Sequence, residues 1–111
     1  MHADEAKVVG KLIDEGMALG YTVSVYDGDE WTVKCSANKV EILEALDTTG
    51  IDRVRFYEGV DSVGTFLLVY GNEPYYVIND FSDNPKSVAL FNKVEPLIDE
   101  LEALAGEVAG F

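Results

Sequence analysis

The sequence has one histidine and one cysteine in 111 residues, and this scarcity limits the chemistry it can perform. His2 lies in a terminal segment that is expected to fray, so a Ser-His-Asp or Cys-His arrangement has no credible base. Cys35 cannot form an internal disulfide, which suits a reducing compartment. Although 21 acidic residues guarantee some close carboxylate pairs, no pattern selects one pair for acid–base catalysis. The sequence therefore predicts no catalytic residue and a protein that is not an enzyme.

Basic residues are also few, and no long apolar run is present. Eight lysines and arginines face 21 aspartates and glutamates, which gives a formal net charge of −13. Such a chain is repelled by nucleic-acid phosphates and by anionic membrane surfaces. No apolar run approaches the roughly 20 residues of a membrane helix, and acids stand where a signal peptide needs positive charge. We therefore expect a cytoplasmic protein that binds a basic protein surface, and neither nucleic acid nor a membrane.

The segment VYDGDEW, residues 25–31, places three acids between a strand and the only tryptophan. A calcium loop needs another oxygen ligand two residues after Asp29, where Trp31 stands, and no bidentate glutamate follows at the required offset. A three-residue turn over 27–29 would instead pair Val25 with Trp31 across a hairpin. We expect a hairpin turn here, and no metal ion or cofactor in the protein.

The sequence does contain enough apolar residues, 48%, to form one modest core. Apolar residues at helical spacing predict helices, and alternating residues predict strands, whose short connections imply antiparallel neighbours. We expect a single α+β domain over residues 1–111, with an antiparallel sheet of about five strands and three helices packed against it, in the order α-β-β-α-β-β-β-α. The helices are expected over 3–19, 39–50 and 84–104, and the strands over 21–26, 31–36, 53–58, 63–71 and 75–81.

Capping and breaking residues mark the ends of the predicted helices. Asn38, with Glu41 three residues later, resembles a capping box at the start of the second helix. Pro85 suits the first turn of the third helix, whereas Pro96 should kink that helix. The apolar run TFLLVY, residues 65–70, predicts a strand in the interior of the sheet that is covered on both faces.

The predicted core combines the inward positions of strands and helices. Alternation in the second strand places Trp31, Val33 and Cys35 on one inward face, so we expect Cys35 to be a buried, inert thiol. The residues expected to be mostly buried are Val25, Trp31, Val33, Leu43, Leu46, Val54, Phe56, Phe66, Leu68, Ile78, Phe91 and Ile98.

Acidic stripes at helical spacing, with tyrosines that strand alternation leaves facing outward, are the candidate partner-binding residues. Like charges three or four residues apart destabilise an isolated helix by about a few tenths of a kcal/mol per pair, and no lysine relieves either stripe. One interpretation is a solvated helix face. The other is a surface that imitates nucleic-acid phosphates or docks on a basic groove. The candidates are Glu41, Glu44 and Asp47 on the second helix, Glu95, Asp99 and Glu102 on the third, and Tyr57, Tyr75 and Tyr76.

Several elements together resemble small acidic proteins of tailed bacteriophages and prophages. They are the DGxxW turn within GYTVSVYDGDEWTVKCSANKVEILEAL, the strand VRFYE, and the segment LLVYGNEPYYVINDFSDN, which cover roughly residues 15–85. The resemblance implies a protein that works in the cytoplasm of a bacterial host and inhibits or redirects a host machine. A nucleic-acid-binding defence complex is one such machine, and its inhibitor would be a DNA mimic of the anti-CRISPR kind.

The size, charge and helix–sheet mixture are also similar to the small acidic chaperones of type III secretion, which hold an unfolded effector segment as homodimers. Here the second helix follows two strands, where that group more often has three. Two hypotheses therefore remain: an acidic inhibitor that binds protein, and a dimeric chaperone or adaptor. An obligate dimer with exposed apolar grooves would indicate the second, whereas a monomer whose binding weakens steeply with salt would indicate the first.

Overall fold

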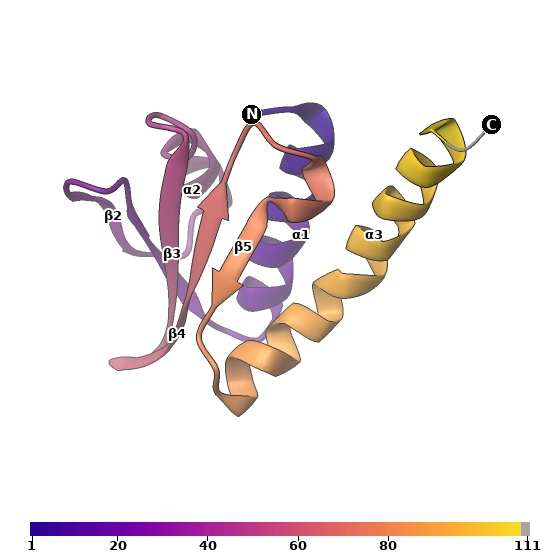
Figure 1. Ribbon diagram of the computed structural model, residues 1–111. Coiled ribbons are helices and arrows are strands. Elements are labelled where there is room, and N and C mark those ends of the chain that lie inside the picture. The colour runs from indigo at the N-terminus through magenta and orange to yellow at the C-terminus, as the bar shows by residue number, and fades with distance from the viewer. Residues whose placement is uncertain (110–111) are drawn as a thin grey trace.

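The chain folds into a five-stranded antiparallel sheet that carries three α-helices (Figure 1). The computed structural model describes residues 1–109, with all side chains except those of residues 74 and 106–109. The predicted α+β class and the order α-β-β-α-β-β-β-α are confirmed. The elements are α1 (Ala3–Ala18), β1 (Thr22–Tyr26), β2 (Trp31–Ser36), α2 (Lys39–Glu44), β3 (Ile51–Glu58), β4 (Asp61–Val69), a 3-10 helix η1 (Pro74–Tyr76), β5 (Ile78–Phe81) and α3 (Pro85–Ala109).

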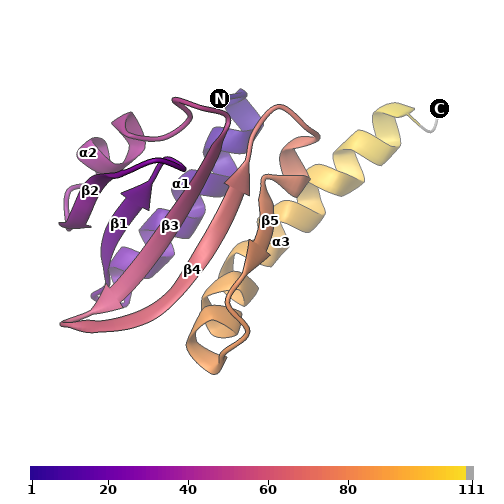
Figure 2. The ribbon, with the colours of Figure 1, turned by 60° about the vertical axis from the view of Figure 1, so that its left-hand side comes forward.

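The strands lie in the order β2-β1-β3-β4-β5, and every neighbouring pair is antiparallel. Helix α1 contacts both α2 and α3, and all three contribute to the same core. No helix lies in front of β3 and β4 in Figure 2, where the opposite face of the sheet is turned toward the reader. Strand β4 is interior, as predicted, but Leu67 and Val69 are only partly buried, so the prediction that both faces are covered is wrong. We call the uncovered side the open face.

The core fills the space between the sheet and the helices. The core side chains lie at alternating positions of β1, β3 and β4, and they pack against side chains at helical spacing on α1 and α3. Gly16 allows the closest approach of α1 to the sheet, because an added Cβ would lie 2.3 Å from Cε1 of Phe56. Four phenylalanine rings continue the core from β3 to α3, with centroids 5.5, 5.4 and 4.6 Å apart in turn. They are Phe56, Phe66, Phe81 and Phe91.

Most of the predicted core is buried. The residues that the structure buries are Val25, Val33, Leu46, Val54, Phe56, Phe66, Leu68 and Ile98. Leu43, Ile78 and Phe91 pack against this cluster but are only partly buried. Trp31 is also partly buried and lies outside the core cluster, so the prediction for this residue is wrong.

The hairpin between β1 and β2 explains the position of Trp31. The connection has four residues rather than three, because Asp27 Oδ1 accepts hydrogen bonds from the backbone N–H groups of Asp29 and Glu30, both at 2.9 Å. Trp31 therefore pairs with Tyr26, and irregular pairing on either side of Val25 shifts the alternation of β2. The predicted pairing of Val25 with Trp31 is wrong, and the tryptophan ring lies on the open face.

The same irregularity exposes Cys35, which we predicted to be buried. Its φ of 46° lies in the left-handed region, as expected in a β-bulge. Its backbone N–H donates to Ser24 Oγ at 2.8 Å, and the two side chains approach to 3.8 Å. Cys35 is therefore an accessible thiol at the β1–β2 edge of the open face.

Caps begin the helices as the sequence indicated, and one is unexpected. Asn38 Oδ1 accepts from Glu41 N at 3.2 Å, and Asn84 Oδ1 accepts from Ser87 N at 2.9 Å. His2, predicted to fray, is the N-cap of α1: its Nδ1 accepts from the backbone N–H of the fourth residue. The backbone N–H of His2 in turn donates to the carboxylate of Glu5, which completes a capping box.

Several element boundaries differ from the predictions, most of all those of α2, β5 and α3. Helix α2 ends at Glu44, because the next residues form a bend in which Asp47 has a φ of 59° and its N–H donates to Asp52 Oδ2 at 2.7 Å. Residues 75–76 belong to η1 and not to a strand. Helix α3 runs unbroken through Pro96 to Ala109, and its path bends along its length (Figure 1). No helix among residues 1–109 is long and apolar enough to cross a membrane.

Candidate protein-interaction surface

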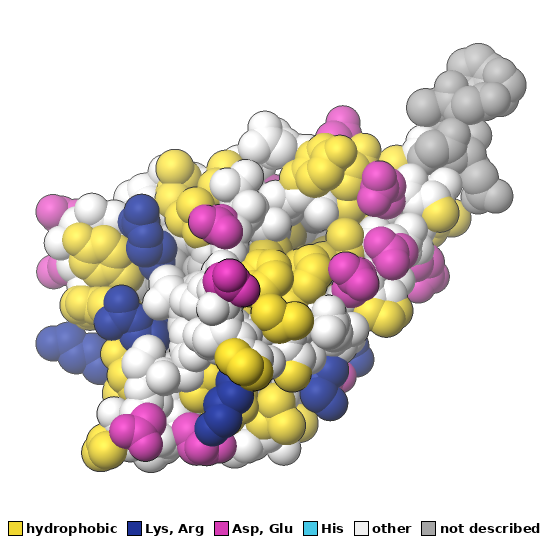
Figure 3. All heavy atoms as spheres, turned by 60° about the horizontal axis from the view of Figure 1, so that its bottom comes forward, with side chains coloured by type: hydrophobic (Ala, Val, Ile, Leu, Met, Phe, Trp, Pro, Cys, Tyr) yellow, Lys and Arg dark blue, Asp and Glu magenta, His cyan; other side chains and the backbone are white. Residues whose placement is uncertain are grey.

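Helix α3 presents three of the predicted acids on its outer side. Val94, Ile98 and Leu101 are buried at helical spacing, so the intervening residues face away from the sheet. Acidic side chains gather on this part of the molecule at the right of Figure 3. We call the three exposed residues Glu95, Asp99 and Glu102 the acidic surface of α3.

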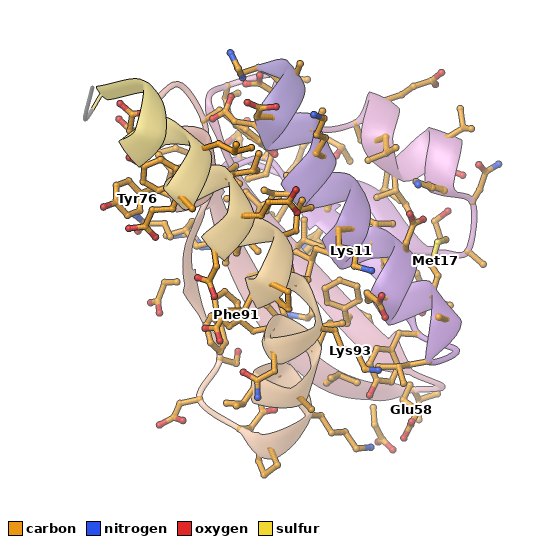
Figure 4. The ribbon with its side chains drawn as sticks, turned by 90° about the vertical axis from the view of Figure 1, so that its right-hand side faces the viewer. Lys11, Met17, Glu58, Tyr76, Phe91 and Lys93 are labelled. Atoms are coloured by element: carbon orange, nitrogen blue, oxygen red, sulfur yellow. The ribbon has the colours of Figure 1, made fainter. Side chains whose placement is uncertain are left out.

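Two predicted tyrosines lie beside this surface, because η1 packs against α3. The rings of Tyr75 and Tyr76 are 4.6 Å apart, and Tyr76 is 54% exposed. Partial burial is the main cause that raises the pKa of Tyr75, and the negative charges of Glu73 and Glu102 add to it. The structure thus brings together residues that are 27 positions apart in the sequence (75 to 102), and Figure 4 shows Tyr76 next to the far part of α3.

A shallow, open hollow of about 690 Å³ adjoins Tyr76. Its lining is polar, and its only large apolar surface is the tyrosine ring itself. The lining residues are His2, Gly71, Asn72, Glu73, Tyr76 and Asn79. A partner side chain that docks on the acidic surface of α3 could extend into this hollow, where amide oxygens and a carboxylate can accept hydrogen bonds from a cationic group.

The acidic surface of α3 is not neutralised by either lysine of the same helix, because Lys86 pairs with Glu58. Lys93 points toward α1 (Figure 4). There Lys11 forms an ion pair with Glu15 at 2.7 Å. This pair, and to a smaller extent the charge of Lys93, lowers the pKa of Glu15. Within the described part of the chain, no base lies within 4.0 Å of a carboxylate oxygen of the acidic surface. These charges therefore remain available to an approaching partner.

The acids predicted near α2 do not form the expected stripe. Glu41 and Glu44 are exposed on α2, but Asp47 lies beyond the end of that helix and pairs with the amino group of Met1. Helix α1 lies between α2 and α3, so the two acidic groups do not join. Tyr57 belongs to β3 and faces the open side, away from both.

Two buried carboxylates, which the sequence analysis did not single out, lie at the N-terminal end of α1. Glu5 is 1% exposed and accepts from Gly71 N at 2.9 Å, and Asp52 is 1% exposed and accepts from Asp47 N. Burial raises the pKa of Asp52, although the hydrogen bond from Asp47 opposes this effect. Burial and the charge of Asp52 in turn raise the pKa of Tyr70. These groups join loops together through buried hydrogen bonds.

The fold and this surface define a class: a small α+β domain with one helix-covered sheet face and an acidic, tyrosine-flanked helix. Comparison with protein-family models, curated proteins and solved structures gives no significant match to the chain. Among residues 1–105 apart from Pro74, no group of three or more His, Cys, Asp or Glu side chains is placed to hold a metal ion.

The sequence analysis missed Arg53 and Arg55, the only arginines in the chain. Both project from β3 onto the open face, because Val54 and Phe56 face the core. A signal was present: basic and buried apolar residues alternate at 53–56.

Proposed function

We propose that the protein is a non-enzymatic, protein-binding inhibitor that uses the acidic surface of α3 to occupy a basic groove on a nucleic-acid-binding complex. The observation that carries this proposal is the juxtaposition of three unpaired acids on α3 with the tyrosines of η1. Tyrosine is enriched at the centres of protein interfaces, and fixed charges on a helix steer a cationic partner into register.

The density of charge supports a groove that otherwise holds phosphates. From Glu95 to Glu102 the helix rises about 10.5 Å, so three charges are spaced about 5 Å apart, against about 3.4 Å per phosphate along one DNA strand. The acidic surface therefore presents roughly two thirds of the axial charge of one strand on a rigid rod. The projecting end of α3, which extends beyond the sheet in Figures 1 and 2, gives that rod access to a recessed site.

The resemblance to small acidic phage proteins supplies the cellular context of the proposal. A phage-encoded inhibitor acts in the host cytoplasm, where defence complexes of the CRISPR kind hold RNA and DNA in basic channels. The large exposed apolar side chains of the described residues are spread over several elements, from the start of the chain to α3, which favours a partner held by charge over an unfolded client.

The test is capture of proteins from a bacterial lysate with three forms of the chain, followed by a titration of the purified partner. E95K/D99K/E102K reverses the acidic surface of α3, and E30K/E41K/E44K makes the same change of charge at three exposed acids elsewhere. We expect the first variant to lose the partner, mainly through slower association that depends on salt. We expect the second to keep it, and duplex DNA to displace the parent chain from the partner.

Two results would contradict the proposal. If both variants lose the same affinity for the partner, the partner responds only to net charge and α3 is not the binding surface. If the α3 variant keeps the partner with an unchanged salt slope, its acids are a solvated surface. A stable dimer that binds unfolded polypeptide would instead indicate the chaperone class.

A further inference from the structure

The open face of the sheet carries a basic and aromatic patch that the acidic surface of α3 does not explain. Strands β1, β2 and β3 turn Tyr26, Trp31, Arg53 and Arg55 to the same side. Lys and Arg side chains gather on this side of the molecule, at the left of Figure 3, over the β2, β1 and β3 end of the sheet. No helix covers it (Figure 2). We call these four residues the arginine patch.

Among the described side chains neither arginine has an acidic partner, although the chain has more than twice as many acids as bases. Four lysines are paired with carboxylates at 2.7–3.3 Å, namely Lys7, Lys11, Lys39 and Lys86. Within the part of the chain whose side chains are described, no acidic oxygen lies within 4.0 Å of Arg53 or Arg55. The two guanidinium charges are therefore not neutralised by a direct ion pair within this part of the protein, although the acids of the β1–β2 turn lie next to Tyr26 and Trp31 in the sequence.

Arg55 is held in place before any partner arrives. Its Nε donates to Thr65 Oγ1 on β4 at 3.0 Å, and its Cζ lies 5.0 Å from the centroid of the Trp31 ring. These contacts fix the plane of the guanidinium and leave its terminal amino groups for another acceptor. A planar guanidinium with a free fork matches a carboxylate in bidentate geometry, and pre-organisation reduces the entropy lost on binding.

The spacing of the two arginines selects the shape of the acceptor. Arg53 and Arg55 are two positions apart on one strand, so their side chains leave the same face about 7 Å apart. Carboxylates at alternate positions of an extended polypeptide have the same separation. An acidic segment that lies along β3 in extended form can therefore pair with both arginines at once.

The aromatic rings disfavour a single-stranded nucleic acid as the occupant. Base stacking needs a free ring face, but Arg55 covers one face of Trp31 and Tyr26 packs against the ring at 5.2 Å. A nucleic acid also brings a phosphate at every nucleotide toward a chain of net charge −13. An acidic polypeptide needs no free ring face, and its carboxylates at alternate positions match the spacing of the two arginines. From this charge and geometry, we infer that the arginine patch docks an extended acidic protein segment with carboxylates at alternate positions. This inference does not depend on the proposed role of α3.

The probe is a short fluorescent peptide in which glutamate alternates with threonine, compared with a peptide of equal composition whose glutamates form one block. We expect the alternating peptide to bind the parent chain and to shift the amide NMR signals of β1 and β3. R53Q/R55Q should weaken binding at least about tenfold, since two charge-assisted pairs are lost. K7Q/K86Q removes the same charge from the helix side and should change the affinity by less than about twofold.

Two further changes, R53K/R55K and alkylation of Cys35, test the same surface if R53Q/R55Q has a low melting temperature. The lysine variant retains the charge without the fork and should bind with intermediate affinity, and a bulky group on Cys35 should obstruct the same face. Equal loss in R53Q/R55Q and K7Q/K86Q, or equal binding of both peptides, would overturn the inference. Tighter binding of oligothymidylate at this face, or self-association through it, would do so as well.

Discussion

A single buried carboxylate makes the stability of this fold depend on pH. Because burial raises the pKa of Asp52 above its ordinary value of 3.8, the folded state holds this proton more tightly than the unfolded state. The stability that Asp52 contributes is therefore complete below that ordinary value and is lost as pH rises through the raised pKa. Asp52→Asn keeps an acceptor for the Asp47 N–H and does not ionise.

We therefore expect Asp52→Asn to be at least as stable as the parent chain at pH 7, with an advantage that shrinks as the pH is lowered toward 4. Urea unfolding of both chains at several pH values measures this difference. Asp52→Ala is the control, because it removes the acceptor and does not ionise, so it should be about 1–3 kcal/mol less stable than Asp52→Asn at every pH. A larger advantage of Asp52→Asn at low pH than at pH 7 would contradict the sign of the shift.

Residues with unusual backbone conformation were the hardest to predict from the sequence. The alternation of β2 indicated a buried Cys35 and an inward Trp31, but the wider turn closed by Asp27 and the bulges after it change which side each residue faces. The left-handed conformation of Asp47 depends on Asp52, a contact that local spacing does not reveal. Where no bulge intervenes, as in β3, alternation assigns the buried Val54 and Phe56 correctly.

At the scale of elements, the approach of α1 to the sheet depends on one glycine. Gly16→Ala would place a Cβ 2.3 Å from Phe56 Cε1, and this ring is confined between Tyr21 and Phe66. We expect a loss of about 1–3 kcal/mol from overpacking, measured by thermal or urea unfolding. Gly10→Ala is the matched control on the same helix. Its Cβ would have no neighbour within 4 Å, so it should stabilise the protein by up to about 1 kcal/mol.

Equal effects of the two substitutions would show that helix propensity, and not the contact with Phe56, decides the outcome.

Helix starts were well predicted, because Asn38 and Asn84 cap through local hydrogen bonds. The acidic surface of α3 was likewise visible as a helical spacing. Its meeting with Tyr75 and Tyr76 was not, because a strand was expected where the chain forms η1.

At the scale of the whole molecule, net charge is the main source of repulsion in the folded state. With a charge of −13, we expect the melting temperature to rise as sodium chloride increases from low concentration, and to level off once the Debye length falls below about 5 Å. Thermal melts across a salt series measure this. A rise that continues linearly at high salt would instead reflect exclusion of salt from apolar surface, and a fall would mean that the ion pairs outweigh the repulsion.

The one-sided cover of the sheet has a consequence for how this molecule could work. The acidic surface of α3 and the arginine patch lie on opposite sides of the sheet, so a ligand on one side does not obstruct the other. A protein built in this way can serve as a bridge between two partners of opposite charge. Each partner would then experience the other at an effective concentration set by a domain only 50 Å in its longest dimension, without any direct affinity between them.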